Sequence, residues 1–280
     1  MLEYLILGFT QGFTEFLPIS SSGHLYVLQW LWGVESTLQL EVIFHFASLI
    51  AIVWVMRKKI KEIIEGLVFV FFDSSGSTDC DRAAHPQKEK ILQLHNNGIL
   101  GVQVLVATIL TIIIALIVKK FVLVDLSIQV VAWGLIITGV LVLVSHLKSK
   151  KSKKFLMIPM GIFVLVGLIQ GIAVLPGISR SGVTIAALMI LGAGRTQSTE
   201  VSFLLSIPII FSAFIYSIKD LEALESILSL DLLMGFFVCV IVSYMSILFM
   251  LKYVQKYWIW FMPYCFIIGG GLLYLSKAMV

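Results

Sequence analysis

The 280-residue sequence is 59% hydrophobic and only 13% charged, with a mean hydropathy of +1.03. This balance excludes an ordinary soluble domain, in which about 25% of the residues are charged. The net charge of +4 does not indicate nucleic-acid binding, because five lysines gather at 148–154 and others flank apolar segments, as is usual beside anionic lipid. The three cysteines are too far apart for a disulfide framework or a metal-ligand set.

Eight apolar segments follow one another along the chain. A spanning helix needs about 20 apolar residues, and six segments qualify: 38–56, 98–118, 127–147, 198–218, 230–251 and 257–277. Two others, 1–33 and 155–194, are interrupted by Pro, Gly and Ser, whose backbone cannot lie bare against lipid. We predict an all-α polytopic membrane protein with one domain, 1–280, in which six transmembrane helices accompany two re-entrant broken-helix hairpins.

The first broken segment recurs in the second at an offset of 159 residues. Seven of sixteen aligned positions are identical: Gly8, Gln11, Gly12, Ile19, Ser20, Ser22 and Gly23 match Gly167, Gln170, Gly171, Ile178, Ser179, Ser181 and Gly182. The match continues into the spanning helices that follow. We predict two repeats, about 1–56 and about 155–218. The GxxxG spacing of the matched glycines indicates close helix packing.

Basic residues predict the orientation in the membrane. The clusters at 57–61 and 148–154, with Lys252 and Lys256, are expected in the cytoplasm, which places the acidic stretch 219–231 outside. Residues 57–97 are then expected to form a polar cytoplasmic loop. If both hairpins turn back, the two repeats have inverted topology. Such repeats place their polar loops near the bilayer midplane, beside the positive ends of half-helices.

The first polar loop, within 18–25, follows a helix that carries Gln11 and Glu15. These side chains are four residues apart, so they share a helix face and offer oxygen ligands for Mg²⁺ or Ca²⁺. A serine after Pro18 can cap a new helix whose free N–H groups favour an anion. His24 follows Ser21 by three residues, so imidazole and hydroxyl are expected to face the same point. Ionisable groups at membrane depth are costly and usually functional.

The second polar loop, 176–184, places Arg180 where the first has Ser21. An arginine fork matches phosphate oxygens in a way that lysine does not. We predict that the two loops form one anion-binding site. The alternative is that the hydroxyls only satisfy broken-helix backbone, while Glu15 and Arg180 form a structural ion pair.

Other ionisable residues are given structural roles. His45 and His146 have no repeated polar neighbourhood, so we interpret them as packing residues. Glu41 and Glu200 begin spanning helices, where an acid complements the helix dipole, although either could line the site. Arg195 could contact lipid headgroups or close the second hairpin.

The segments from Gln11 to His24 and from Pro176 to Gly182 resemble the motifs of the bacterial undecaprenyl-diphosphate phosphatase family associated with bacitracin resistance. Length, crossings and repeat agree over nearly the whole chain. The resemblance implies removal of the terminal phosphate from a C55 polyprenyl diphosphate, which regenerates the lipid carrier for peptidoglycan synthesis. It also implies a bacterial plasma-membrane protein whose active site opens to the outer face. Where the family has Glu or Gln, Gln11 takes the amide option, so Glu15 carries more of the metal binding.

The resemblance leads to a mechanistic hypothesis of in-line displacement. Ser21 is the nucleophile or orients a water, His24 transfers protons, and Glu15 holds Mg²⁺ or acts as base. Arg180 and loop N–H groups hold the phosphates. Five hydroxyls are expected to contact phosphate or support these groups: Ser20, Ser22, Ser179, Ser181 and Thr184.

A different class of function is transport, because alternating-access carriers also have inverted repeats around a midplane anion site. The chain would then flip polyprenyl phosphate. His24 near Ser21 and Glu15 favours hydrolysis, since binding alone needs no nucleophile or proton carrier. A channel or structural bundle predicts no phosphate-specific group at membrane depth, and Arg180 counts against it. The expected partners are the polyprenyl diphosphate and membrane lipid, with a homodimer left open.

Overall fold

Helices alone make up the regular structure of the residues that the computed structural model describes, 1–33, 38–72, 85–121, 127–149, 157–217 and 229–278. Six helices in these ranges are long and apolar enough to cross a membrane. They are α3 (Leu38–Phe72), α5 (His85–Phe121), α6 (Ile128–Ser149), α9 (Arg195–Ser217), α11 (Leu230–Tyr257) and α12 (Phe261–Ala278), the last preceded by the 3-10 turn η1 (Trp258–Trp260). The predicted all-α polytopic fold is confirmed.

Two pairs of short helices interrupt this series. The helices α1 (Leu2–Thr14) and α2 (Ser21–Trp32) precede α3, and α7 (Met160–Ile172) and α8 (Arg180–Ile190) precede α9. A helix of 13 residues is about 20 Å long and cannot cross a hydrocarbon core of about 30 Å alone. The order of two short helices and one long helix therefore occurs twice along the chain. The inverted insertion of the two repeats stays a prediction.

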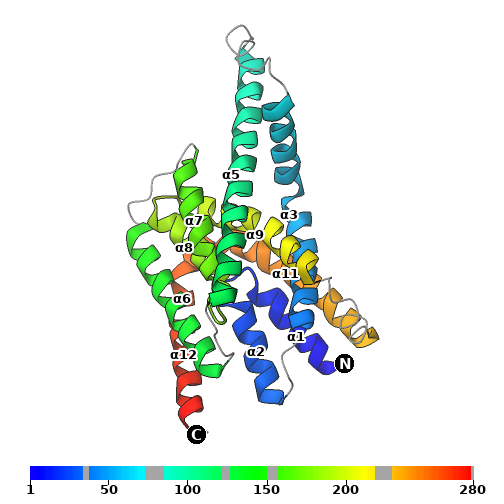
Figure 1. The fold of residues 1–280 in the computed structure, drawn as a ribbon, viewed down its shortest axis with the longest axis vertical. Helices are drawn as coiled ribbons and strands as arrows, with labels where there is room; N and C mark the ends of the chain where they lie inside the picture. The colour runs from blue at the N-terminus through cyan, green and yellow to red at the C-terminus, as the bar shows by residue number, and fades with distance from the viewer. Residues whose placement is uncertain (34–37, 73–84, 122–126, 150–156, 218–228, 279–280) are drawn as a thin grey trace.

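The polar loop predicted for 57–97 is wrong wherever this segment is described. Helix α3 continues to Phe72 and α5 begins at His85, and Figure 1 shows the two helices side by side, extending beyond the rest of the bundle. The charges here have helical spacing, so Lys59 pairs with Glu62 at 3.1 Å and also donates to Asn97 Oδ1 of α5 at 3.0 Å. Residues 73–84, most of the basic run 148–154 and most of the acidic stretch 219–231 lie outside the described residues.

The connection between α1 and α2 lies inside the protein, which resolves the problem of bare backbone at membrane depth. Phe16, Leu17 and Ile19 are almost fully buried in a core shared with α3, α8 and α9. The ring of Phe16 meets that of Phe203 edge to face, with centroids 5.2 Å apart. This loop is thus held by core packing, and lipid does not surround it.

Glycines fix how closely the hairpins approach the spanning helices. Gly8 of α1 packs against the backbone of Gly235 in α11, and Gly167 of α7 packs against Ala107 in α5. The repeated glycines therefore serve close packing, as their spacing indicates. Polar contacts strengthen the second seam, where Thr111 donates to Gly167 O at 3.0 Å and Gln170 donates to Thr111 at 2.9 Å.

Replacing Gly8 with Ala is expected to lower the thermal stability of the protein in detergent. The added Cβ would overlap the Gly235 carbonyl, and overpacking of this kind costs about 1–3 kcal/mol. Gly270→Ala is the matched control, because a Cβ there meets open space and alanine favours a helix. Equal melting temperatures for the two variants would contradict this packing account.

Candidate functional site

Two serine caps of the same kind build the two polar loops. Ser20 accepts a hydrogen bond from Gly23 N at 3.3 Å at the start of α2, and Ser179 accepts one from Gly182 N at 3.0 Å at the start of α8. The two acceptors, Ser20 and Ser179, are 159 residues apart, and so are the two donors, Gly23 and Gly182, so the caps are repeat counterparts. The predicted serine cap after Pro18 is confirmed, and each capped helix directs its free N–H groups to the polar end.

Ser20 has the only positive φ among the described non-glycine residues, at 66°. A serine in this region is strained, and such strain persists only where surrounding contacts hold it. The Gly23 cap is one such contact. The other is His24, whose Nδ1 lies 2.7 Å from the Ser20 carbonyl oxygen.

The two loops contact each other directly. Ser181 Oγ donates to Leu17 O at 2.9 Å, and Ser179 Oγ donates to the same oxygen at 3.4 Å. A Cβ built on Gly23 would lie 3.2 Å from Gly177 Cα, so the backbones also meet. The structure therefore brings the two predicted loops together.

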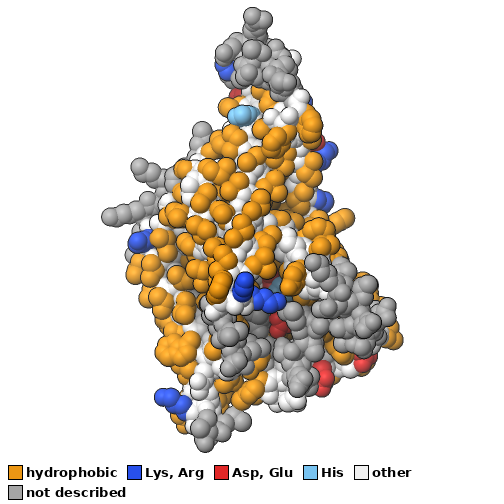
Figure 2. Space-filling model, in the orientation of Figure 1, with side chains coloured by type: hydrophobic (Ala, Val, Ile, Leu, Met, Phe, Trp, Pro, Cys, Tyr) orange, Lys and Arg blue, Asp and Glu red, His pale blue; other side chains and the backbone are white. Residues whose placement is uncertain are grey.

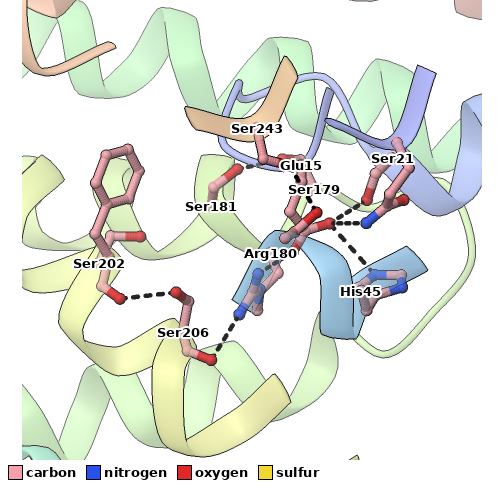
Figure 3. Close-up of polar contacts among 12 residues, drawn as sticks. Glu15, Ser21, His45, Ser179, Arg180, Ser181, Ser202, Ser206 and Ser243 are labelled. Carbon is pink, nitrogen blue, oxygen red and sulfur yellow. Dashed lines mark hydrogen bonds and ion pairs between the residues drawn. The ribbon is translucent and has the colours of Figure 1, made fainter. Parts of the chain in front are cut away.

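The carboxylate of Glu15 is the centre of the polar contacts (Figure 3). Its Oε2 accepts hydrogen bonds from Ser21 Oγ at 2.6 Å and from Gln11 Nε2 at 2.9 Å. Its Oε1 pairs with Arg180 Nη2 of the second loop. The Glu15 side chain is 3% exposed and that of Arg180 is 18% exposed, so the pair is largely removed from solvent.

A cavity of about 310 Å³ opens onto this pair, and we call it the headgroup cavity. Its polar lining consists of Glu15, Ser20, Ser21, Ser22, Glu41, His45, Ser179 and Arg180. The remaining lining is apolar and comes from Val42 of α3, from α9 and from the segment 173–178. Cavities of this size stand at the lower end for drug-sized ligands. The headgroup cavity thus suits a small anionic group better than a long lipid.

The predicted meeting of His24 with Ser21 is not what the structure shows. His24 does not line the headgroup cavity, and its Nε2 lies 2.6 Å from Tyr264 OH of α12 while the two rings stack. The cause is local, since Nδ1 is held by the Ser20 carbonyl one turn earlier. His24 therefore supports the loop from behind the cavity.

Three other predicted residues also lie behind the cavity lining. Thr184 Oγ1 donates to Arg180 O at 2.9 Å and shares a hydrogen bond with Ser202 of α9. Ser181 is held by the first loop, and Gln11 is fully buried beneath Glu15. These side chains position Arg180 and Glu15.

The structure adds His45 to the site, so the interpretation of His45 as an ordinary packing residue is wrong. Its Nε2 lies 3.3 Å from Glu15 Oε2, and its Nδ1 lies 2.7 Å from Glu41 O. The repeat did not indicate His45 as a site residue, because Leu204 occupies the matching position in the second repeat. The signal was present in the spacing of Glu41 and His45, which share a helix face at membrane depth. Glu41 also lines the cavity, in addition to its place in the first turn of α3.

The oxygen donors at this site fit a hard cation such as Mg²⁺ or Ca²⁺ in kind. Glu15, Glu41 and Ser21 line one cavity, and Gln11 Oε1 is buried without a hydrogen-bond partner beside Glu15. No group of three or more His, Cys, Asp or Glu side chains is placed to hold a metal within the described ranges. This set suits a cation that keeps several waters and is bound partly by substrate phosphate.

Glu15→Gln and Arg180→Gln are each expected to destabilise the protein by about 3 kcal/mol, because each leaves the other charge buried and unpaired. The double variant is expected to lose clearly less than the sum. Unfolding of the four proteins in detergent measures the coupling. Simple additivity would show that the ion pair does not join the two loops.

Comparison with known proteins places the chain in a family. The model described as bacitracin resistance protein BacA matches residues 4–271. A protein named undecaprenyl-diphosphatase from Methanosphaera stadtmanae is 35% identical over 290 residues, covering 100% of this chain and 99% of its own. Proteins of the same name from Desulfatibacillum aliphaticivorans and Treponema denticola are 35% identical (97% of each chain) and 34% identical (91% of this chain and 90% of the relative). The chain therefore belongs to the bacitracin resistance protein BacA family.

Proposed function

We propose that this multi-pass membrane protein hydrolyses undecaprenyl diphosphate to undecaprenyl phosphate and inorganic phosphate. The activity recycles the lipid carrier for peptidoglycan synthesis and confers resistance to bacitracin. Relatives that carry the name undecaprenyl-diphosphatase cover nearly the whole chain. The structural observation that carries the proposal is the Glu15 carboxylate, which joins a hydroxyl of one loop and a guanidinium of the other at a single cavity.

Arg180 is proposed to bind the diphosphate. When phosphate oxygens enter the cavity, they compete with Glu15 for the guanidinium fork, whose planar donors match them. The free N–H groups at the starts of α2 and α8 add further positive potential. Ser20, Ser22 and Ser179 line the same cavity and supply hydroxyl donors to the phosphates.

Ser21 and Glu15 are proposed to carry the displacement. Glu15 Oε2 already accepts the Ser21 hydroxyl hydrogen at 2.6 Å, so it is placed to take that proton. In one route the Ser21 oxygen attacks the terminal phosphorus, undecaprenyl phosphate leaves, and water then releases phosphate from the serine. In the other route Ser21 orients a water that attacks directly. A divalent cation at Glu15 and the phosphates would neutralise charge on the leaving group.

Two imidazoles are proposed to act with this centre. His45 contacts Glu15 directly, while His24 holds the strained Ser20 next to Ser21. His24 stays a proposed proton-transfer partner, because it lies one turn beyond Ser21 on α2.

The membrane orientation is proposed from the basic residues at 57–61, which are expected in the cytoplasm. With Arg57 and the lysines beside it in the cytoplasm, α3 begins outside, and the headgroup cavity near Glu41 then lies in the outer half of a bacterial plasma membrane. Figure 2 shows a largely apolar surface on the face in view, as contact with lipid requires, with a cluster of Lys and Arg side chains just below its centre. Association of two copies into a homodimer stays a prediction.

Release of phosphate from undecaprenyl diphosphate by the purified protein in detergent tests the activity. Arg180→Ala and Ser21→Ala are expected to lower kcat/KM at least about 100-fold, because each removes a group that acts on the reacting phosphates. Arg180→Lys keeps the charge without the fork and is expected to fall between them and wild type. Ser212→Ala, an α9 serine that donates to Pro208 O, is the matched control and is expected to stay at wild-type activity. Undiminished turnover in Arg180→Ala would contradict the proposal.

His45→Ala is expected to lower kcat about 100-fold, because it removes the imidazole that contacts Glu15. His45→Gln keeps a hydrogen-bond donor there and is expected to retain more activity. His24→Ala measured alongside separates the roles. Undiminished activity in His45→Ala together with a loss in His24→Ala would reject the proposed role of His45.

Chelation with EDTA is expected to abolish phosphate release, and added Mg²⁺ or Ca²⁺ is expected to restore it. Gln11→Glu places a second carboxylate beside Glu15, so it should lower the half-saturating metal concentration roughly tenfold. Gln170→Glu is the matched control, since Gln170 is the repeat counterpart of Gln11 and its amide donates to Thr111. An unchanged metal requirement in Gln11→Glu would argue against metal binding at Glu15.

Transport of polyprenyl phosphate is the second candidate function, and one observation favours it. Glu41, Val42 and His45 line the headgroup cavity, while their repeat counterparts Glu200, Val201 and Leu204 line a second cavity of about 480 Å³. In alternating-access carriers two repeats rock against each other around a central site, and cavities lined by equivalent residues of both repeats fit that architecture. Faster movement of a labelled prenyl phosphate across proteoliposomes, without phosphate release by the wild-type protein, would favour transport over hydrolysis.

A further inference from the structure

A large apolar cavity lies on the spanning helices beside the headgroup cavity. It has a volume of about 850 Å³, and we call it the apolar groove. Helices α3, α9 and α11 supply its walls, which include Phe46, Ile50, Trp54, Phe211, Ile241 and Tyr244. Most of these side chains are substantially exposed, such as Ile241 at 61% and Phe211 at 51%. The apolar groove is therefore open to a hydrocarbon ligand.

The apolar groove and the headgroup cavity share two helices at the same level. His45 lines the headgroup cavity, and its neighbour Phe46 lines the apolar groove. On α9 the same holds for Ile210 and Phe211. Phe46 stacks on Phe214 of α9, with centroids 4.0 Å apart. The two cavities are thus one residue apart on both α3 and α9, and Phe46, which stacks on Phe214, lies on the groove side.

The groove follows one face of α3 away from the headgroup cavity. Phe46, Ile50 and Trp54 recur every four residues, and Arg57 comes at the next turn, about 17 Å from Phe46 along the helix. The Arg57 guanidinium lies 4.7 Å from the centre of the Trp54 ring, so a charged group marks the far end. The headgroup cavity, the apolar groove and Arg57 thus form a polar region, an apolar stretch of limited length and a polar end, in that order along α3.

The size of the headgroup cavity makes a second binding region necessary for a long substrate. At about 310 Å³ it holds a small headgroup, whereas the substrate of the proposed function carries a 55-carbon apolar tail. Aromatic and branched aliphatic side chains are the surface that a methyl-branched chain packs against best.

We propose that the apolar groove binds the first part of the polyprenyl tail while the diphosphate occupies the headgroup cavity. This inference rests on the proposed function and adds the basis of chain-length preference. Prenyl units within about 17 Å of the headgroup contact the groove and increase kcat/KM. Units beyond Arg57 lie in lipid and add little to kcat/KM.

The test fills the groove and compares two substrates. Ile50→Trp adds bulk inside the groove, and Ile109→Trp makes the same change on α5, where Ile109 is 57% exposed and lies outside the groove. Ile50→Trp is expected to lower kcat/KM about tenfold for undecaprenyl diphosphate and less than about twofold for dimethylallyl diphosphate, because Ile50 lies about 6 Å beyond Phe46 along α3 and a single prenyl unit ends before it. Ile109→Trp is expected to change neither value. Equal losses for both substrates, or no loss for either, would overturn the proposal.

Photolabelling separates failure of the groove from failure of the phosphatase. A prenyl phosphate with a diazirine in its first tail units is expected to label the groove walls, on α3 between Phe46 and Arg57 or at Phe211 and Ile241, and excess undecaprenyl phosphate should remove the label. This result requires no turnover. Labelling outside the groove, or labelling that undecaprenyl phosphate does not compete away, would overturn the proposal that the groove binds the tail. This holds even if phosphate release is confirmed.

Discussion

The buried carboxylate of Glu15 is the constraint on which the rest of the site depends. A charge at membrane depth is costly unless other groups compensate for it, and here Arg180, His45, Ser21 and Gln11 all contact it. These partners come from α1, α2, α3 and α8, so satisfying one carboxylate draws together segments up to 165 residues apart. In the proposed function the ion pair and the binding site are one arrangement, because a diphosphate that enters the cavity would take over partners that Glu15 already organises.

A second constraint is the backbone of the broken helices, which has no water to satisfy it inside a bilayer. Serine caps at Ser20 and Ser179 close the new helices, and the hydroxyl of Ser181 satisfies the Leu17 carbonyl of the other loop. Close packing at the glycines of α1 and α7 then brings each hairpin against a spanning helix. The same devices that make irregular backbone tolerable also aim two helix N-termini and the Arg180 side chain at one cavity.

Much of this architecture follows from patterns visible in the sequence. The six spanning helices, the two breaks, the serine cap and the meeting of the two loops were all predictable, because each depends on local composition or on the repeat. The placement of His24 and His45 was not predictable in the same way. His24, three residues after Ser21, contacts Tyr264, whereas His45 on another helix contacts Glu15. Which of the two imidazoles faces Glu15 depends on how the helices are rotated against their neighbours. The helical extension of α3 and α5 was missed because charged residues with helical spacing were interpreted as a loop.

In the proposed function the lipid substrate is divided between a small polar cavity and an adjoining apolar groove, and both loops together hold the diphosphate. The most direct measurement is an experimental structure of the protein with a non-hydrolysable polyprenyl methylenediphosphonate. We expect phosphonate oxygens within hydrogen-bond distance of both Arg180 and Ser21, with the guanidinium withdrawn from Glu15. A headgroup bound by one loop alone, or bound in the cavity lined by Glu200, would contradict this expectation.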